Sequence, residues 1–376
     1  MFSLLLFGVS SLAYTQCECP FVAGYWEAWN LSRPTDYGSI LKKVNVEDKC
    51  GCSGYDPVLI AFANYEFTTD CHQRPTFGFI NDQVQSNGDV FDADELKKSI
   101  EKLHSEGAEV YVSFGGATFG YGSVLTCDAH IKAFVEALLK RIEYYKLDGI
   151  DFSHVIPDSA ATLIKIIEKL RHFNPKVKII YTIPANGTKF SPWKDVVAAV
   201  ASKVNYVQIT VYDYDNTGYT AAADFTRLKA LGVPNQRMIY GVMPGTHEHA
   251  DEYTSLADAK AIGKFIALEK LAGAAIWSIN RDTDHRNVLT SPLYQTGKPD
   301  GSYAKAIRNG ICKYNEECRK LSHGWSDCDD DRDDCDDQDD QDDRDDCDDR
   351  DDYDDCDDRD DRDDCDDRDD RDDCDD

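Results

Sequence analysis

Short apolar segments alternate with amphipathic segments along most of this chain of 376 residues. The amphipathic segments carry apolar residues at helical spacing, as Leu163, Ile166 and Leu170 do, so each helix has one apolar stripe. Alternating strands and helices favour a parallel sheet covered by helices. Eight strands close such a sheet into a barrel, so the sequence predicts an α/β fold, a (β/α)8 TIM barrel over residues 20–310. The expected strands are residues 21–29, 58–64, 110–114, 149–153, 178–184, 206–212, 238–243 and 274–279.

Residues 1–15 predict a signal peptide. They form a short apolar run that ends near Ser11 and Ala13, whose small side chains suit signal-peptidase cleavage. The run is too short to cross a bilayer as a helix. The alternative is a buried first strand, but Cys17 and Cys19 follow at once and fit export to an oxidising compartment. We therefore expect a secreted, extracellular protein.

The negative charge of the chain is concentrated at its C-terminal end. Residues 327–376 hold 34 aspartates and 7 arginines, a net charge of −27, which leaves −3 for the rest of a chain whose formal total is −30. Such a low-complexity tail cannot bury a core and is expected to be disordered. The body has no basic patch for nucleic acid and no further apolar run of membrane length, so neither partner is expected.

The acidic tail has three interpretations. The simplest is a solvated segment that keeps the protein soluble. Its dense carboxylates could instead bind calcium weakly and collectively, although no EF-hand spacing is present. Its six cysteines could also form disulfides between chains.

Eight further cysteines lie in the body, an even number that indicates disulfides in a secreted chain. Their close pairs have one intervening residue, which is not the usual zinc spacing, so no metal site is expected. Asn30 and Asn186 begin glycosylation sequons. The expected pairs are Cys71 with Cys127, Cys312 with Cys318 inside a short segment of residues 311–326, and Cys17 and Cys19 with Cys50 and Cys52 in an unassigned order.

The fourth expected strand carries the clearest motif. Asp148 and Asp151 flank Gly149 within an apolar run, and Ser153 and Val155 follow on the same face as Asp151. This segment resembles the Asp-Gly-x-Asp-x-Asp-x-Glu signature of family 18 glycoside hydrolases, the chitinases. In that family the glutamate protonates the glycosidic oxygen and the third aspartate orients the acetamido group of the substrate. The resemblance puts Ser153 at the position of the third aspartate and Val155 at the position of the glutamate. It therefore implies a chitinase fold without chitinase chemistry.

Other strand ends add to the resemblance. Residues 113–116 are similar to the family's Ser-x-Gly-Gly motif, and Phe62 matches its strand-two phenylalanine. Phe62 is expected to be core, His154 a packing residue and Asp148 a brace for its strand. Aromatic and carboxylate groups at strand ends suit a sugar. The resemblance implies that the carbohydrate-binding residues are Tyr25, Asp151, Tyr212, Asp213 and Trp277.

The resemblance implies a catalytically inactive protein that binds chitin or another N-acetylglucosamine-containing glycan, without a cofactor. Only residues 244–254 separate strand seven from its helix, so the insertion domain of many chitinases is absent and a shallow groove is expected. One alternative is a weakly active hydrolase that uses a displaced acid from another strand end. Another is an extracellular-matrix or calcium-binding scaffold that acts through the tail. The oligomeric state is left open. The candidate displaced acids are Glu27, Glu66, Asp213 and Asp282.

Overall fold

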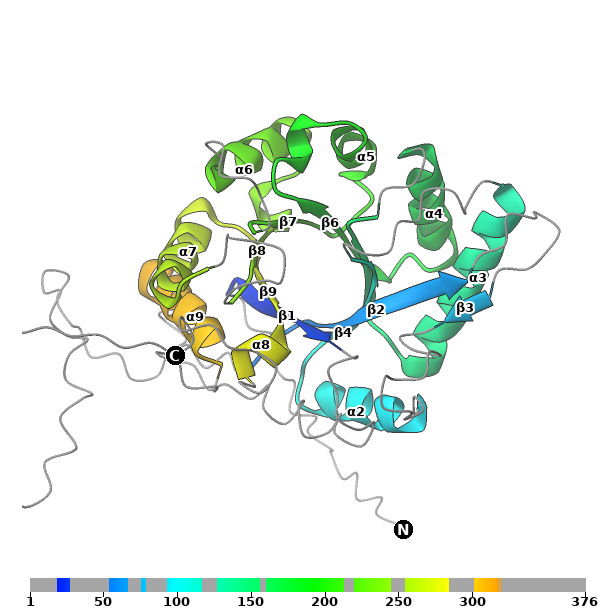
Figure 1. Ribbon diagram of the computed structural model, residues 1–376, viewed down its shortest axis with the longest axis horizontal. Coiled ribbons are helices and arrows are strands. Elements are labelled where there is room, and N and C mark those ends of the chain that lie inside the picture. The colour runs from blue at the N-terminus through cyan, green and yellow to red at the C-terminus, as the bar shows by residue number, and fades with distance from the viewer. Residues whose placement is uncertain are drawn as a thin grey trace, which may run out of the picture. The chain divides into compact units, whose positions relative to one another are not determined.

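The computed structural model shows the arrangement of the body of the chain (Figure 1). The chain divides into two units, Met1–Trp325 and Ser326–Asp376, and all residues described below belong to the first. The described residues are 19–27, 54–66, 76–78, 93–116, 127–155, 160–212, 220–244, 254–283, 301–316 and 318.

Eight parallel strands form a closed barrel, which confirms the predicted fold. Each strand pairs with its neighbour, and β1 closes the ring by pairing with both β2 and β9. Figure 1 shows this ring from one end with the helices outside it. The strands are β1 (Phe21–Glu27), β2 (Val58–Glu66), β4 (Val110–Gly115), β5 (Gly149–Ser153), β6 (Lys178–Pro184), β7 (Tyr206–Thr210), β8 (Met238–Val242) and β9 (Gly273–Trp277).

The strands differ from expectation in several details, and β7, for example, ends at Thr210 instead of residue 212. A short strand, β3 (Thr76–Gly78), pairs antiparallel with the end of β2 and was not predicted. The last strand ends at Trp277 instead of residue 279, because Ile279 already begins helix α8. Ser278 O accepts hydrogen bonds from the backbone N–H groups of Arg281 and Asp282, so a helical turn replaces the strand there.

The helices bury the apolar stripes that the sequence predicts. Leu163, Ile166, Ile167 and Leu170 of α4 are all buried against the barrel. Ser255 caps α7 by accepting a hydrogen bond of 3.1 Å from the backbone N–H of Asp258. The helices are α2 (Ala93–Ser105), α3 (Asp128–Tyr145), α4 (Ala160–Phe173), α5 (Trp193–Val200), α6 (Ala221–Ala230), α7 (Leu256–Glu269), α8 (Ile279–Thr283) and α9 (Ser302–Tyr314), with 3-10 turns η3 (Gly187–Lys189) and η4 (Asn235–Arg237).

Strand alternation separates an inner core from an outer core. Tyr25 packs inside the barrel with Leu59 and Ile180. Trp26, its neighbour in sequence, points to the opposite face and is buried in the outer cluster between strands and helices.

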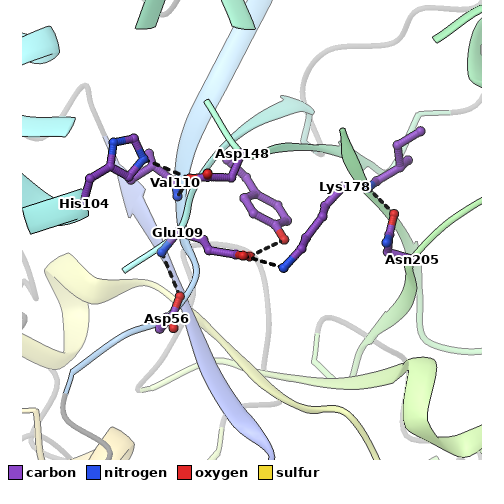
Figure 2. Close-up of polar contacts among 9 residues, drawn as sticks. Asp56, His104, Glu109, Val110, Asp148, Lys178 and Asn205 are labelled. Carbon is purple, nitrogen blue, oxygen red and sulfur yellow. Dashed lines mark hydrogen bonds and ion pairs between the residues drawn. The ribbon is translucent and has the colours of Figure 1, made fainter. Parts of the chain in front are cut away.

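The N-terminal ends of the strands form the floor of the barrel (Figure 2). Glu109 accepts hydrogen bonds from the side chains of Tyr111, at 2.8 Å, and Lys178. Asp148 accepts from the backbone N–H of Val110 at 2.8 Å and lies 2.9 Å from His104 Nε2. Asp148 therefore braces β4 at the floor, whereas a brace for its own strand, β5, was expected, and it lies at the opposite end from the strand ends that carry the other motif residues.

The disulfide pairing differs from the predicted scheme. Cys19 is bonded to Cys318, with Cα atoms 5.4 Å apart, so both the Cys312–Cys318 pair and the pairing of Cys19 with Cys50 or Cys52 were wrong. Cys127 and Cys312 each take part in a further disulfide. Cys71, the expected partner of Cys127, lies outside the described residues, as do Cys17, Cys50 and Cys52.

Candidate carbohydrate site

A buried carboxylate lies near the C-terminal ends of the strands. Asp151 of β5 is completely buried and accepts hydrogen bonds from three side-chain hydroxyls. Tyr25 donates at 2.9 Å, Ser113 at 2.6 Å and Thr182 at 2.7 Å. These donors come from β1, β4 and β6, so Asp151 holds one side of the barrel interior together.

The surroundings of Asp151 change its protonation. Burial raises the pKa of its carboxyl from the ordinary 3.8 to about 6, because the three hydroxyl hydrogen bonds only partly compensate for the loss of water. Each of these donors is neutral. Asp151 therefore takes up a proton close to neutral pH.

Three aromatic rings gather beside this carboxylate. Trp277, at the end of β9, meets Tyr25 edge to face with ring centroids 5.3 Å apart. Phe62 stacks on Trp277 at 5.3 Å with an angle of 15° between the rings. Both Phe62 and Trp277 keep part of their surface accessible. Phe62 therefore lies beside the candidate site, and it also packs against the inner core of the barrel, which is the role expected of it from the sequence.

Tyr212 lies in the same interior. Its side chain is buried, and it is near enough to Tyr25 to contribute to the raised pKa of that phenol, after burial and the charge of Asp151. The structure thus brings together Tyr25, Asp151, Tyr212 and Trp277. Asp213, the fifth predicted binding residue, lies outside the described residues.

The end of β5 shows what stands where the resemblance places acids. Ser153 is buried, and its Oγ lies 3.3 Å from His154 Nδ1. Val155 is also buried, with 7% of its surface exposed. His154 Nε2 lies 3.2 Å from the hydroxyl of Thr210, and burial lowers the pKa of this imidazole to about 4. His154 is therefore neutral at physiological pH and links two hydroxyls.

Two glycines bring β4 close to β5. Gly115 has φ of +107°, and a Cβ there would lie 1.9 Å from the carbonyl oxygen of Ser153. Gly116 has φ of +83° and donates its N–H to the same carbonyl at 2.8 Å. The Gly-Gly pair therefore serves backbone geometry.

The described carboxylates at other strand ends already have partners. Glu27 accepts from the hydroxyl of Ser278 and lies 3.4 Å from Arg281 Nε. Asp282 accepts from the hydroxyl of Tyr55 and from two backbone N–H groups at the start of α9. Glu27 and Asp282 are thus structural braces at the rim. The side chain of Glu66 lies outside the described residues.

One polar side chain in the interior was not anticipated. Gln208 of β7 is completely buried, and neither its Nε2 nor its Oε1 has a hydrogen-bond partner in the structure. It follows Tyr206 and precedes Thr210 on the inward face of its strand. Its place on the expected strand of residues 206–212, two positions before Thr210, was the available signal.

The two predicted glycosylation sites differ in what the structure shows. Asn186 has a left-handed backbone, its Oδ1 is buried, and Thr188 of its sequon is buried with its hydroxyl on Asp224. Asn30 lies outside the described residues. Glycosylation of either residue stays a prediction.

Neither a metal cluster nor a membrane span is found where the structure describes the chain. No group of three or more metal-ligating side chains occurs among these residues. None of the described helices is long and apolar enough to cross a membrane.

Known proteins resemble the chain in sequence and in fold. The sequence profile of the family described as "Glycosyl hydrolases family 18" matches residues 22–247. Endochitinase 3 of Metarhizium robertsii is 22% identical over 265 residues, which are 64% of this chain and 84% of that protein. Endochitinase 3 of Metarhizium anisopliae is 24% identical over 255 residues, 62% of this chain and 86% of that protein.

Solved chitinase structures share the barrel. A chitinase from Rhizomucor miehei superposes with a TM-score of 0.53 at 17% identity, covering 76% of this chain and 99% of that chain. Catalytic site mutants of active domain 2 of the Pyrococcus furiosus chitinase, complexed with chito-oligosaccharides, superpose with a TM-score of 0.56 at 21% identity. They cover 81% of this chain and 97% of that chain. At such identities the structures establish a common fold.

Proposed function

Because the chain belongs to glycosyl hydrolase family 18, we propose that it is a chitinase-like protein that binds a glycan without cleaving it. The glycan is chitin or another chain that contains N-acetylglucosamine. The observation that carries the proposal is the combination, at one end of the barrel, of accessible aromatic rings with Ser153 and Val155 at the positions where the resemblance expects acids.

The aromatic rings support binding. Trp277 is partly accessible and is held by Phe62 on one side and Tyr25 at its edge. A pyranose presents an apolar face that an aromatic ring covers well, while polar tips bind its hydroxyls. Chito-oligosaccharides are the ligands complexed with the Pyrococcus furiosus mutants.

The carboxylates support the absence of turnover. A general acid must reach the glycosidic oxygen within hydrogen-bond distance. Asp151 is completely buried and occupied by three hydroxyls, and the described rim acids Glu27 and Asp282 hold other groups. Valine at 155 has no proton to donate. The displaced-acid alternative is left with Asp213 and Glu66.

Secretion is part of the proposal. The apolar N-terminal run and the even cysteine count are its support from sequence, and the Cys19–Cys318 bond fits an oxidising compartment. The matrix or calcium-binding alternative depends on the acidic tail, outside the described residues.

A fluorogenic chitobioside assay tests the absence of hydrolysis. We expect background turnover from the wild type and a measurable rise in the double variant Ser153→Asp, Val155→Glu, which restores both acids. Wild-type turnover that persists through purification to homogeneity would contradict the proposed absence of hydrolysis and would favour a displaced acid.

Isothermal titration with chitotetraose tests binding. We expect Trp277→Ala to weaken binding by about 1–3 kcal/mol, the range for a packed aromatic. Phe173→Ala is the matched control, because Phe173 is 57% exposed at the floor-side end of α4. If the wild type gives no heat and retains no chitin in a pull-down, the glycan proposal fails and the scaffold alternative gains.

A further inference from the structure

A cavity opens at the floor of the barrel, on the end opposite Trp277. Its volume is about 640 Å³, within the range of small-molecule sites. It lies between the end of α4, the residues that lead into β7 and the turn that leads into β8. Its lining includes three cationic side chains, Arg171, Lys203 and Arg237, and no carboxylate.

Arg171 is held rigidly at one side of the cavity. Its Nε donates to the carbonyl of Lys203 at 2.7 Å, and its Nη1 donates to the carbonyls of Pro175, at 3.2 Å, and Val177. Nη2 donates to Oδ1 of Asn205. All four acceptors are neutral, so none of them offsets the charge of the guanidinium, and one of its five N–H groups has no partner in the part of the chain that the structure describes.

Arg237 faces Arg171 with even fewer partners. It is exposed, and among the described residues its only hydrogen bond is a long one, 3.4 Å from Nη1 to the carbonyl of Ala201. Burial lowers the pKa of Arg171, and the charge of Arg237 lowers it further, so the two guanidinium groups repel each other. An anion between them would remove that repulsion.

Two acids near the cavity already have cationic partners. Glu168 pairs with Lys203 at 3.4 Å, and Glu109 is held by Lys178 and Tyr111 (Figure 2). Neither Arg171 nor Arg237 forms an ion pair within the described part of the chain. Two uncompensated guanidinium groups therefore meet at a cavity with room for more than an ion.

We propose that this floor cavity binds a tetrahedral oxyanion, the phosphate or sulfate group of an ester. A guanidinium donates two parallel hydrogen bonds to such a group, and Arg237 has the free N–H groups to do so. The unused N–H of Arg171 completes the cradle. Pro175, Pro234 and the ring of Tyr206 line the rest of the cavity and face the organic part of the ester. This site is independent of the glycan site at the other end of the barrel.

Isothermal titration of the full chain tests the site. The probes are inorganic phosphate, inorganic sulfate, glucose 6-phosphate and glucose 6-sulfate, in chloride buffer of constant ionic strength. We expect saturable one-to-one binding, and each ester should bind more tightly than its free anion. Comparison of the affinities for glucose 6-phosphate and glucose 6-sulfate then shows which of the two groups the site prefers. Arg237→Gln should weaken binding about tenfold or more, as expected for the loss of a charge-assisted bidentate contact.

The controls separate a built site from general charge attraction. Lys140→Gln removes one positive charge from the exposed face of α3 and should leave anion binding unchanged. Arg237→Lys should recover only part of the affinity, because an ammonium cannot donate the bidentate pair. Chitotetraose titration of Arg237→Gln should match the wild type. Absence of saturable binding, or equal losses in Arg237→Gln and Lys140→Gln, would overturn the proposal.

Discussion

The two ends of the barrel treat a carboxylate in opposite ways. At the floor, Glu109 is matched by the ammonium of Lys178 and by the phenol of Tyr111. At the C-terminal end, Asp151 has three hydroxyls and no cation, and its pKa rises to about 6. An ion pair favours the charged form of a carboxylate, whereas neutral hydroxyl donors leave Asp151 able to gain or lose a proton near pH 6.

This difference follows the division of labour in such barrels, where the floor contributes stability and the opposite end carries the site. The floor charges are only partly buried, so an ion pair there costs little to desolvate. A cation beside Asp151 would bring a second buried charge into the interior where the proposed sugar site begins. Hydroxyls satisfy the carboxylate and stay compatible with a neutral ligand.

The largest expected effect is at the C-terminal end. Asp151→Ala leaves three buried hydroxyls without their acceptor and should lower the free energy of unfolding by about 3–4 kcal/mol. Denaturant unfolding at pH 5 measures it, since the carboxyl is then mostly protonated and its desolvation does not mask the hydrogen bonds. Asp151→Asn keeps one acceptor and should lose clearly less; equal losses would show that packing, not hydrogen bonding, holds this end.

Next in size is the pH dependence. The folded pKa of Asp151, about 6, lies above the ordinary 3.8, so the folded state binds more protons between these values and stability falls as pH rises through them. The wild type should gain at most about 3 kcal/mol from pH 7 to pH 4 relative to Asp151→Asn. If the free energy of unfolding changed with pH by the same amount in both proteins, the raised pKa of Asp151 would be contradicted.

Removing a charge at the floor of the barrel should lower the free energy of unfolding by less than the changes at Asp151, and its pH dependence should differ. Burial lowers the pKa of Lys178, but the hydrogen bond and charge of Glu109 outweigh it, so the net shift is upward and Lys178 loses its charge only at alkaline pH. Lys178→Met should cost about 1–2 kcal/mol at pH 7, because the pair is 29% and 27% exposed and solvent screens it. Lys165→Met is the control, since its pair with Asp128 is 53% and 78% exposed and should contribute almost nothing. A loss as large as that of Asp151→Ala would erase the contrast between the ends.

The smallest effect should come from outside the barrel. Truncation after Trp325 should leave the melting temperature almost unchanged, because the sequence predicts a disordered tail without packed contacts. Any calcium dependence of the full chain should disappear with the 34 aspartates. Calorimetry of both forms with and without calcium checks this, and a truncated protein that unfolds would show that the tail belongs to the fold.

Periodicity predicted the barrel well because burial imposes it. The bounds of β5 and β6 match the sequence prediction, since both strands are apolar and end at polar or turn residues. The end of β9 was misplaced because Ile279 continues the apolar pattern, while the backbone there has already turned into α8.

The missed features depend on contacts between distant segments. Phe62 lies beside the site only because β2 and β9 bring it onto Trp277, and sequence spacing carries no trace of that stacking. An even cysteine count predicted disulfides but not partners, and Cys19 meets Cys318 across 299 positions. The floor cavity likewise combines residues from three separate loop regions of the chain, so no single sequence motif predicts it.

The Cys19–Cys318 bond makes the backbone of the barrel a covalent ring. A protease that cuts any loop inside this ring opens it without releasing a fragment, so a nicked barrel still migrates as one piece until a reductant is added. The same ring means that new chain ends can be created in a loop between β-strands while the old ends stay joined. Circularly permuted forms of the barrel are therefore a realistic engineering target.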